Sequence, residues 1–339
     1  MQRAVLAALA GLMALAVTEF AAAAEVNVYS LRQEFLIRPF LDKFAEETGI
    51  TVNTVYTKDG VQERLEAEGA QSPADVVLTV DIARLDQLAK AGLLQPVSSP
   101  VLEQNIPAQF RHPDGLWYAL TARARIIYAS KERVQPGEIS TYEELADPKW
   151  KGRICMRSSK HDYNRALAAS MLAAHGEAET LAWMKALREN QARKPQGNDR
   201  SQVKAIKEGL CDLALGNTYY YGAMKFNEKQ PEQKTWADAV NLIFPNADGR
   251  GTHVNISGVA MTKSAKNKDA AIRLIEFLSR REAQAMYAEL NYEYAVNPAV
   301  QPDPEVASWG ALKPDPVSLQ SIAELSPKAA MLFDQAGFE

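Results

Sequence analysis

The chain has 339 residues, of which 47% are hydrophobic and 24% charged, and 38 basic and 42 acidic residues give it a formal net charge of −4. This length exceeds what one hydrophobic core usually supports, so we expect two domains or lobes. No run of Lys and Arg offers a surface that could follow a phosphate backbone, and we therefore do not expect a nucleic-acid partner.

The first 24 residues are typical of a secretory signal peptide. Residues 1–3 supply a short positive start, residues 4–17 are apolar, and four alanines precede a cleavage point before Glu25. The apolar run is too short for a membrane-spanning helix, which needs about 18 apolar residues, and Glu19 interrupts it. We therefore expect an exported protein that is soluble after cleavage.

Strands and helices alternate at the start of the mature chain. The expected elements are a strand at 25–30, a helix from Phe35 to Gly49, strands at 50–56 and 74–79, and a helix at 82–91. Asp81 stands where it can cap the last of these helices. Such alternation predicts an α/β domain with a largely parallel sheet.

The pattern changes at residues 116–130, where two apolar strand-like runs flank Thr121–Arg125. We expect the chain to cross there into a second lobe. That lobe is predicted to contain a strand at 152–156, helices at 165–175, 177–189 and 201–208, and a strand at 211–215. After a turn-rich segment at 245–253, a strand at 254–261 should return to the first lobe. Helices are expected at 266–290 and from about 305.

Two α/β lobes with two crossings predict a clamshell. The expected lobes comprise residues 25–122 with about 253–304, and about 123–252 with 305–339. Ligands of open α/β sheets bind beyond the carboxyl ends of the strands, so the cleft should collect the loops that follow strands. These loops contain residues 32–33, Asp81, 158–163, 217–221 and 255–257.

The two cysteines, Cys155 and Cys211, are expected to form a disulfide. An even number of cysteines in an exported chain favours pairing. Both lie on short strand-like runs, and neighbouring strands can hold two cysteines at bonding distance. A zinc site would require further Cys or His at close spacing, which the sequence lacks.

Three consecutive tyrosines follow a predicted strand in the segment CDLALGNTYYYGAMK, residues 211–225. Asn217 or Thr218 suits the N-cap of a helix there. Tyr219 and Tyr220 would then lie on the first turn and face the cleft, while Tyr221 turns away and packs. A further phenol, Tyr163, lies in another loop after a strand. Packing is the common role of any single tyrosine, and for these three together packing and ligand binding both remain open.

Several phenols in one cleft would suit a small, highly charged cation. A free tyrosine has a pKa of about 10, so phenolate formation at neutral pH costs about 4 kcal/mol for one side chain and on the order of 12 kcal/mol for three. A hard trivalent cation that deprotonates its ligands offsets this cost. Soft metals would require clusters of Cys, Met or His. An octahedral ion would still lack ligands, which an anion held by arginine could supply.

With these residues the chain resembles the periplasmic ferric-ion-binding proteins, the solute receptors of iron ABC importers. The resemblance covers nearly all of the mature chain, and its most specific element is Asn217–Tyr220. Weaker supporting segments are VNVYSLRQ (26–33), SPADVVLTVDIARL (72–85), TARARIIYASKERV (121–134), KGRICMRSSKHDYN (151–164) and GTHVNISGVAM (251–261). It implies a transferrin-like, type II-like periplasmic clamshell, ferric iron as cargo, an inner-membrane permease as partner, a monomer, and no enzymatic activity.

The resemblance also implies roles for individual side chains. Tyr163, Tyr219 and Tyr220 would bind Fe³⁺, and Arg32, Gln33 and Arg123 would hold a synergistic carbonate or bicarbonate. Many relatives have His or Tyr directly after the arginine of the first loop, whereas this chain has Gln33. The chain therefore resembles the subgroup that binds iron through the tyrosines of one lobe and carbonate.

Three other side chains near the expected cleft have more than one interpretation. We expect Arg125 to form a surface or interlobe ion pair, although it points to the same face as Arg123. His161 is an ordinary loop residue or a neighbour of the ligands. Glu34 opens a helix, where acidic side chains are favoured, but it could also reach the cleft.

Two other function classes stay open. A binding protein for an oxyanion or small organic solute would use Arg32 and Arg123, with the tyrosines stacking or hydrogen-bonding. An enzyme would need a catalytic motif, and the sequence has no nucleophile elbow, metal-hydrolase His pair or phosphate loop. The carboxylates Asp75 and Asp81 have no evident catalytic partner.

Overall fold

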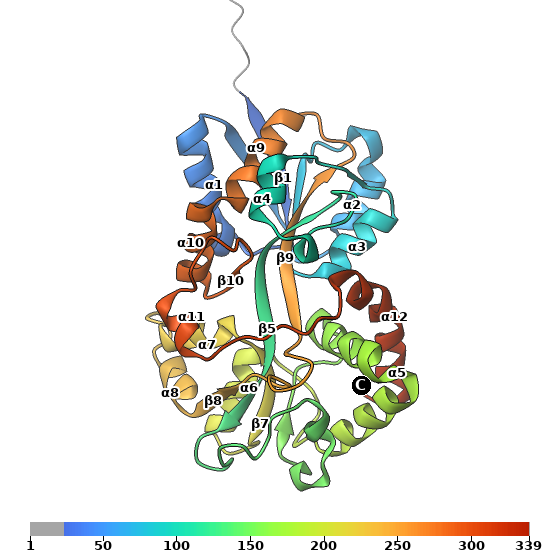
Figure 1. The fold of residues 1–339 in the computed structure, drawn as a ribbon, viewed down its shortest axis with the longest axis vertical. Helices are drawn as coiled ribbons and strands as arrows, with labels where there is room; N and C mark the ends of the chain where they lie inside the picture. The colour runs from blue at the N-terminus through green and yellow to red at the C-terminus, as the bar shows by residue number, and fades with distance from the viewer. Residues whose placement is uncertain (1–23, 339) are drawn as a thin grey trace, which may run out of the picture.

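The computed structural model describes residues 24–338. Residues 1–23, which contain most of the expected signal peptide, lie outside the described residues, as does residue 339. Two α/β lobes lie one above the other in Figure 1, and the long strands β5 and β9 run between them. Within the described part of the chain, no helix has both the length and the apolar character needed to cross a membrane.

The strands form one continuous path of hydrogen-bonded neighbours in the order β2-β1-β3-β9-β5-β7-β6. Their bounds are β1 (Glu25–Ser30), β2 (Thr51–Tyr56), β3 (Val76–Thr79), β4 (Leu94–Gln95), β5 (Tyr118–Ser130), β6 (Ile154–Cys155), β7 (Leu213–Asn217), β8 (Val240–Ile243), β9 (Val254–Thr262) and β10 (Tyr294–Ala295). β4 pairs with β9, and β8 and β10 pair with β5.

Helices cover both lobes (Figure 1). Their bounds are α1 (Glu34–Thr48), α2 (Val61–Glu68), α3 (Ile82–Lys90), α4 (Pro100–Asn105), α5 (Asp162–Glu189), α6 (Asp199–Lys207), α7 (Tyr219–Lys225), α8 (Glu232–Asp238), α9 (Lys268–Ser279), α10 (Arg281–Asn291), α11 (Pro304–Ser308) and α12 (Leu319–Gln335). Short 3₁₀ turns lie at Gly69–Gln71, Ala108–Phe110, Glu143–Ala146 and Pro148–Trp150.

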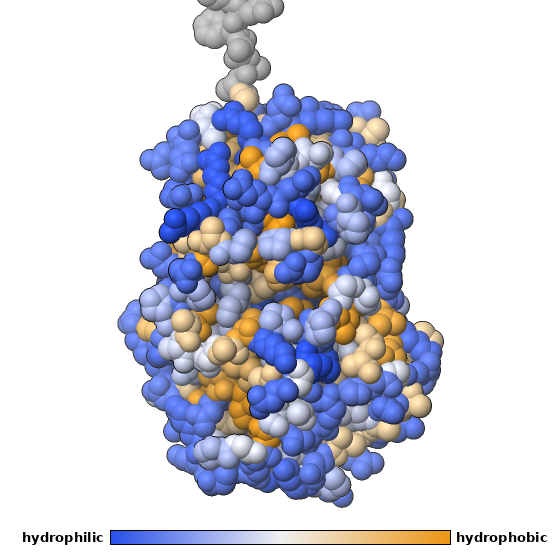
Figure 2. Space-filling view, viewed as in Figure 1, coloured by the Kyte–Doolittle hydropathy of each residue, from blue (hydrophilic) through white to orange (hydrophobic). Residues whose placement is uncertain are grey.

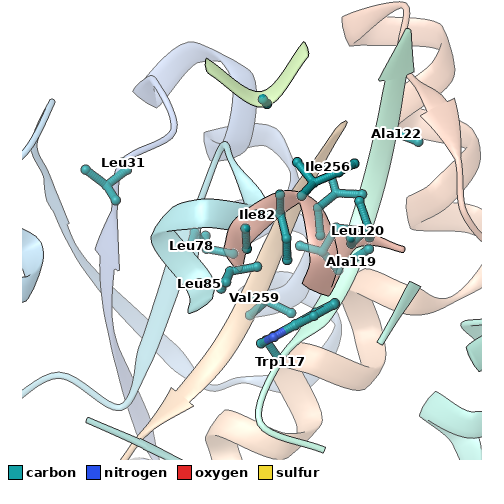
Figure 3. Close-up of a cluster of buried hydrophobic side chains, with 14 of the residues drawn as sticks. Leu31, Leu78, Ile82, Leu85, Trp117, Ala119, Leu120, Ala122, Ile256 and Val259 are labelled. Carbon is teal, nitrogen blue, oxygen red and sulfur yellow. The ribbon is translucent and has the colours of Figure 1, made fainter. Parts of the chain in front are cut away.

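The first lobe is built on a sheet of mixed direction, so the prediction of a largely parallel sheet is wrong: β9 and β5 enter it antiparallel to their neighbours. β1 pairs in parallel with both β2 and β3, and β3 pairs antiparallel with β9. All residues of β3 are buried, as its continuous apolar run predicts for a strand covered on both faces. The Asp81 side chain accepts the Ala83 N–H at 2.8 Å and caps α3, as predicted. Figure 3 shows Ile82 and Leu85 of this helix close to Val259 of β9, within the apolar core of the lobe.

The crossing between the lobes lies within a single strand. Up to Ala124, β5 pairs antiparallel with β9, and from Arg125 it pairs with β7 and further on with β8. All its residues are buried. The crossing expected at Thr121–Arg125 is therefore confirmed, although the two flanking runs are one uninterrupted strand. β9 provides the second crossing.

The second lobe packs helices around β6, β7 and β8. The two helices expected at 165–175 and 177–189 are present as the two parts of α5, which are separated at Gly176, where the backbone is not helical (φ 79°, ψ 178°). The C-terminal helix α12 packs against α5 and also contacts α3 of the first lobe (Figure 1). The two-lobed α/β fold is thus present, and the division of residues between the lobes that the sequence predicted stays a prediction.

The predicted disulfide is present. Cys155 on β6 and Cys211, just before β7, are bonded, with their Cα atoms 5.9 Å apart. β6 and β7 are parallel neighbours, and Cys155 lies opposite Ala214. Both cysteines are buried, so the bond fastens the strand that leads to the tyrosines to its neighbour inside the lobe.

Candidate ligand-binding cleft

A cavity of about 250 Å³ lies between the lobes. Figure 2 shows a hollow band across the molecule at this level, where hydrophobic residues come to the surface. Both lobes contribute to its wall. The polar and aromatic lining residues are Arg32, Gln33, Phe35, Arg123, Tyr163, Arg200, Tyr219, Tyr220, Ser257, Asn291, Tyr292 and Glu293. Every site residue predicted from the sequence, the disulfide aside, is among them.

Three phenols converge in this cavity from two helices of the second lobe. Tyr163 lies in the first turn of α5, and Tyr219 and Tyr220 begin α7. The hydroxyls of Tyr163 and Tyr219 are 3.1 Å apart and share a hydrogen bond. The ring centroids of Tyr219 and Tyr220 are 4.3 Å apart. The structure therefore brings together three side chains that lie up to 57 positions apart in the sequence.

The turn that carries the tandem tyrosines is fixed by contacts to β5. Thr218, one of the two residues predicted for the N-cap of α7, occupies that position, but its side chain makes no capping hydrogen bond. Asn217 is the last residue of β7, and its side-chain oxygen accepts from Arg125 at 3.0 Å. The Thr218 N–H donates to the Ala124 carbonyl at 3.0 Å. The Thr218 hydroxyl oxygen also accepts the Ala124 N–H at 3.4 Å, so tertiary hydrogen bonds engage both side chains that suit an N-cap.

The third tyrosine of the run turns away from the cavity, as predicted. The Tyr221 ring packs edge-on against Trp309, with centroids 5.8 Å apart. Lys225, one turn further along α7, pairs with Glu305 at 2.8 Å. Glu305 also accepts the indole N–H of Trp309 at 2.8 Å. Tyr221 and Lys225 therefore fasten the outer face of α7 to α11 and the residue after it.

Burial makes the tandem phenols harder to ionise than free tyrosine. It raises the pKa of Tyr219 well above the usual value, and the neighbouring Tyr163 and Tyr220 raise it further. Burial, followed by the charge of Asp199, raises the pKa of Tyr220 to about 12. These hydroxyls stay protonated at neutral pH unless a cation binds to them.

A buried charge network lies beneath the phenols. Asp199 accepts from Arg125 at 2.8 Å and from Arg157 at 3.1 Å, and it also accepts the Asn217 N–H at 3.0 Å. Burial alone would raise the pKa of Asp199, but the two guanidiniums lower it overall. The expectation of a surface or interlobe ion pair for Arg125 is therefore wrong, because its partner is fully buried within the second lobe.

His161 and Glu34 have structural roles. The His161 imidazole accepts the Tyr163 N–H at 3.2 Å and caps α5, and its ring centroid lies 4.4 Å from that of Tyr163. Burial, and then the charge of Arg157, lowers the pKa of His161 to about 4, so the ring is neutral at physiological pH. Glu34 lies in the first turn of α1 and pairs with Arg38 at the surface.

Two arginines converge on one hydroxyl at the first-lobe side of the cavity. Arg32 and Arg123 donate to the Ser257 oxygen at 2.8 and 3.1 Å. Arg32 also forms a buried ion pair with Glu293, and although burial lowers the pKa of Arg32, this carboxylate raises it overall. Arg123 donates to the Val80 carbonyl, and its guanidinium lies 5.6 Å from the Tyr163 ring centroid.

The lobes also touch beside the cavity. Arg84 of α3 pairs with Asp162, the residue before Tyr163, at 3.0 Å. On α7, a Cβ at Gly222 would lie 2.4 Å from the Tyr292 ring, and the rings of Tyr292 and Phe226 are stacked. Tyr292 follows α10 of the first lobe and has a positive φ of 56°. These contacts hold the two walls of the cavity together.

Glu293 and Arg200 also line the cleft, and neither was predicted from the sequence. Glu293 joins Arg32 from the short segment between α10 and β10, and no local sequence pattern predicts such a long-range pair. Arg200 lies in the first turn of α6, which begins two residues before the predicted helix. The pair Asn198 and Ser201 forms a capping box there, and this spacing could have located the helix start.

Comparison with known proteins agrees with this architecture. Residues 40–314 match the family described as bacterial extracellular solute-binding protein. The chain belongs to this family. It is 48% identical over 316 residues to iron uptake protein A1 of Synechocystis sp., covering 93% of this chain and 88% of that protein. It is 29% identical to the major ferric iron-binding protein of Neisseria meningitidis serogroup B, covering 94% of each chain.

Solved structures of similar proteins have the same fold. The apo ferric ion-binding protein A of Pasteurella haemolytica matches with a TM-score of 0.88 at 48% identity, covering 93% of this chain and 98% of that chain. A Trichodesmium protein in complex with iron and citrate ligands matches with a TM-score of 0.89 at 42% identity, covering 93% and 100%. The resemblance to ferric-ion-binding proteins that the sequence predicted is thereby confirmed.

Proposed function

We propose that this protein captures ferric iron in the periplasm and delivers it to an ABC permease of the inner membrane. Tyr163, Tyr219 and Tyr220 would bind the ion as phenolates. The observation that carries this proposal is the convergence of these phenols, with the Tyr163 and Tyr219 hydroxyls 3.1 Å apart. That arrangement offers hard oxygen donors to a single small cation.

The energetics of the site favour a trivalent ion. A pKa of about 12 for Tyr220 means that its deprotonation at pH 7 costs about 7 kcal/mol before any cation binds. Burial also raises the pKa of Tyr219 well above the usual value. A trivalent cation offsets these costs by direct charge attraction, and three phenolates neutralise it. A weakly charged or soft ion would leave the phenols protonated.

A synergistic carbonate or bicarbonate would complete the coordination of the iron. Arg32, Gln33 and Arg123 would bind this anion from the first-lobe side. Since Glu293 already neutralises Arg32, the net positive charge on that side comes from Arg123, which has no ion pair among residues 24–338. Its guanidinium near the Tyr163 ring would attract an anion toward the iron site.

The relatives support iron as the cargo. Iron uptake and ferric iron binding are the functions named for proteins that cover nearly the whole chain. In the proposed cycle a monomeric receptor takes up Fe³⁺ in the cleft and the lobes close, with contacts such as Arg84 to Asp162 made across the rim. The permease then receives the ion. Neither catalysis nor nucleic-acid binding has a place in this cycle.

The visible spectrum of the purified protein tests the proposal. Ferric iron added with bicarbonate should give a coloured complex through phenolate-to-iron charge transfer, and omission of bicarbonate should weaken or shift the absorption band. A protein that stays colourless and binds no ferric iron in the presence of bicarbonate would refute the proposal.

Single substitutions test the ligands. Tyr163→Phe, Tyr219→Phe and Tyr220→Phe should each remove most of the iron affinity and change the charge-transfer band, because each deletes one oxygen donor. Tyr221→Phe is the matched control, since this neighbour on α7 packs against Trp309 and should bind iron as the wild type does. Normal iron binding by both tandem variants would show that the ligands are elsewhere.

A second candidate is a receptor for an oxyanion or small organic solute, and the two arginines on Ser257 favour it. In that case Arg32 and Arg123 would form the primary site, and the phenols would stack or hydrogen-bond. Calorimetry with ferric iron and with iron-free anions separates the two functions, because only the iron receptor requires the metal for tight binding.

A further inference from the structure

The three arginines that line the cavity differ in how many of their guanidinium N–H groups already bind to other residues. Arg32 has the largest number of such contacts. It pairs with Glu293 and donates to Ser257, and its guanidinium lies 5.3 Å from the centroid of the Tyr287 ring. It is 4% exposed. An anion that bound Arg32 through both Nη nitrogens would have to displace the Glu293 carboxylate.

Both Nη nitrogens of Arg123 are also hydrogen-bonded within the protein. One Nη nitrogen donates to Ser257 at 3.1 Å and the other donates to the Val80 carbonyl. The residue is 2% exposed, so these contacts fix its guanidinium in the wall of the first-lobe side. It can attract an anion by charge, but both ends of its fork already face protein acceptors.

Arg200 on α6 is different. Its side chain lines the same cavity, yet it forms neither a hydrogen bond nor an ion pair with any residue between 24 and 338. Its Nε is buried without an acceptor, as are those of Arg32 and Arg123, so the difference lies in its Nη nitrogens. Its guanidinium carbon lies 5.5 Å from the centroid of the Tyr220 ring. The Arg200 guanidinium therefore lies beside the phenols in the second lobe, and its N–H donors bind to none of the described residues.

From this difference we infer that Arg200 forms a second-lobe anion site, which binds the carbonate that completes the iron coordination. This inference rests on the proposed function. The planar fork of a guanidinium matches two oxygens of a carbonate-like anion, and such charge-assisted pairs are stronger than neutral hydrogen bonds. The third oxygen then faces the phenol cluster, where an iron ion would lie next to Tyr220.

The position of Arg200 implies an order in which iron, the anion and the first lobe come together. Tyr163, Tyr219, Tyr220 and Arg200 all belong to the second lobe, on α5, α7 and α6. Iron and anion can therefore both bind to this lobe before the cleft closes. Arg123 and Gln33 approach the bound anion only from the other side, as the lobes come together.

The experiment measures how much bicarbonate the protein needs for iron binding. Arg200→Gln should raise the bicarbonate concentration at half-maximal charge-transfer absorbance at least tenfold, which corresponds to about 1.4 kcal/mol of anion binding. Arg200→Lys, which keeps the charge but loses the fork, should give an intermediate shift. Lys207→Gln removes an exposed cation from the same helix and is the matched control, with no shift expected.

Three outcomes decide between the possibilities. An unchanged bicarbonate requirement in Arg200→Gln, with a raised requirement in Arg123→Gln, would overturn the inference and place the anion on the first-lobe side. Iron affinity that falls equally at all bicarbonate concentrations would also overturn it, because Arg200 would then support only the Tyr220 phenolate. If the wild type itself bound no ferric iron, the proposed function would fail first. Melting curves of all variants establish that they are folded.

Discussion

Asp199→Asn is the substitution that most directly tests the network beneath the phenols. Asp199 is fully buried and is the carboxylate partner of both Arg125 and Arg157. The asparagine side chain has nearly the same shape and can still accept the Asn217 N–H. The substitution therefore removes one negative charge and leaves the guanidiniums of Arg125 and Arg157, which are 2% and 12% exposed, without their carboxylate partner.

The expected loss of stability is large. Removal of one partner of a buried ion pair costs about 3–5 kcal/mol, because the remaining charge is left without compensation. With an m-value of about 2–3 kcal/mol per molar urea, the unfolding midpoint should fall by roughly 1–2.5 M. The charges of the arginines lower the pKa of Asp199, so its contribution is present above the ordinary aspartate pKa of about 4 and is lost as the pH falls below it.

The assay is urea unfolding at pH 7 followed by circular dichroism, with Asp212→Asn as the control. Asp212 also joins two arginines, Arg133 and Arg153, but these side chains are 34% and 31% exposed. Solvent screens such pairs, so the control should lose less than about 2 kcal/mol. Equal losses in the two variants, or a loss below 1 kcal/mol for Asp199→Asn, would refute the reasoning.

Two further predictions concern other parts of the fold. Replacement of Cys155 and Cys211 by alanine should cost about 4 kcal/mol in the free energy of unfolding, as expected for a bond that closes 56 residues of chain, and reducing agent should not destabilise the double variant further. Burial, and then the charge of Asp162, raises the pKa of Asp81 to about 6, so wild-type stability should fall as the pH rises from about 4 through 6. Asp81→Asn should lose this pH dependence and keep the cap of α3; equal slopes in urea titrations of both proteins would contradict it.

The sequence predicts the features of this fold that depend on local pattern. The alternation of strands and helices, the cap at Asp81 and the disulfide all follow from residue type and short spacing. The grouping of Tyr163 with Tyr219 follows from a general rule, since both come after strands whose carboxyl ends meet at one edge. The geometry agrees, with 3.1 Å between their hydroxyls.

The predictions that were wrong depend on contacts between distant segments. Asn217 has the right side chain for an N-cap, but Arg125 takes its side-chain oxygen, and this competition depends on how β5 meets β7. The sequence predicted a surface or interlobe ion pair for Arg125. It could not indicate the actual partner, Asp199, because that residue lies 74 positions away. Periodicity gives no information on which carboxylate a buried arginine will meet.

Because β5 belongs to both lobes, a movement of one lobe relative to the other would change which arginines lie near the phenols. Arg123 lies opposite Asn255 of β9, whereas Arg125, two residues on, lies opposite Asn217 of β7. A rotation of one lobe relative to the other about Ala124 would leave Arg125 in place beside the tyrosines and change the distance of Arg123 from them. The electrostatic potential that an ion meets beside the phenols would therefore differ between an open and a closed cleft.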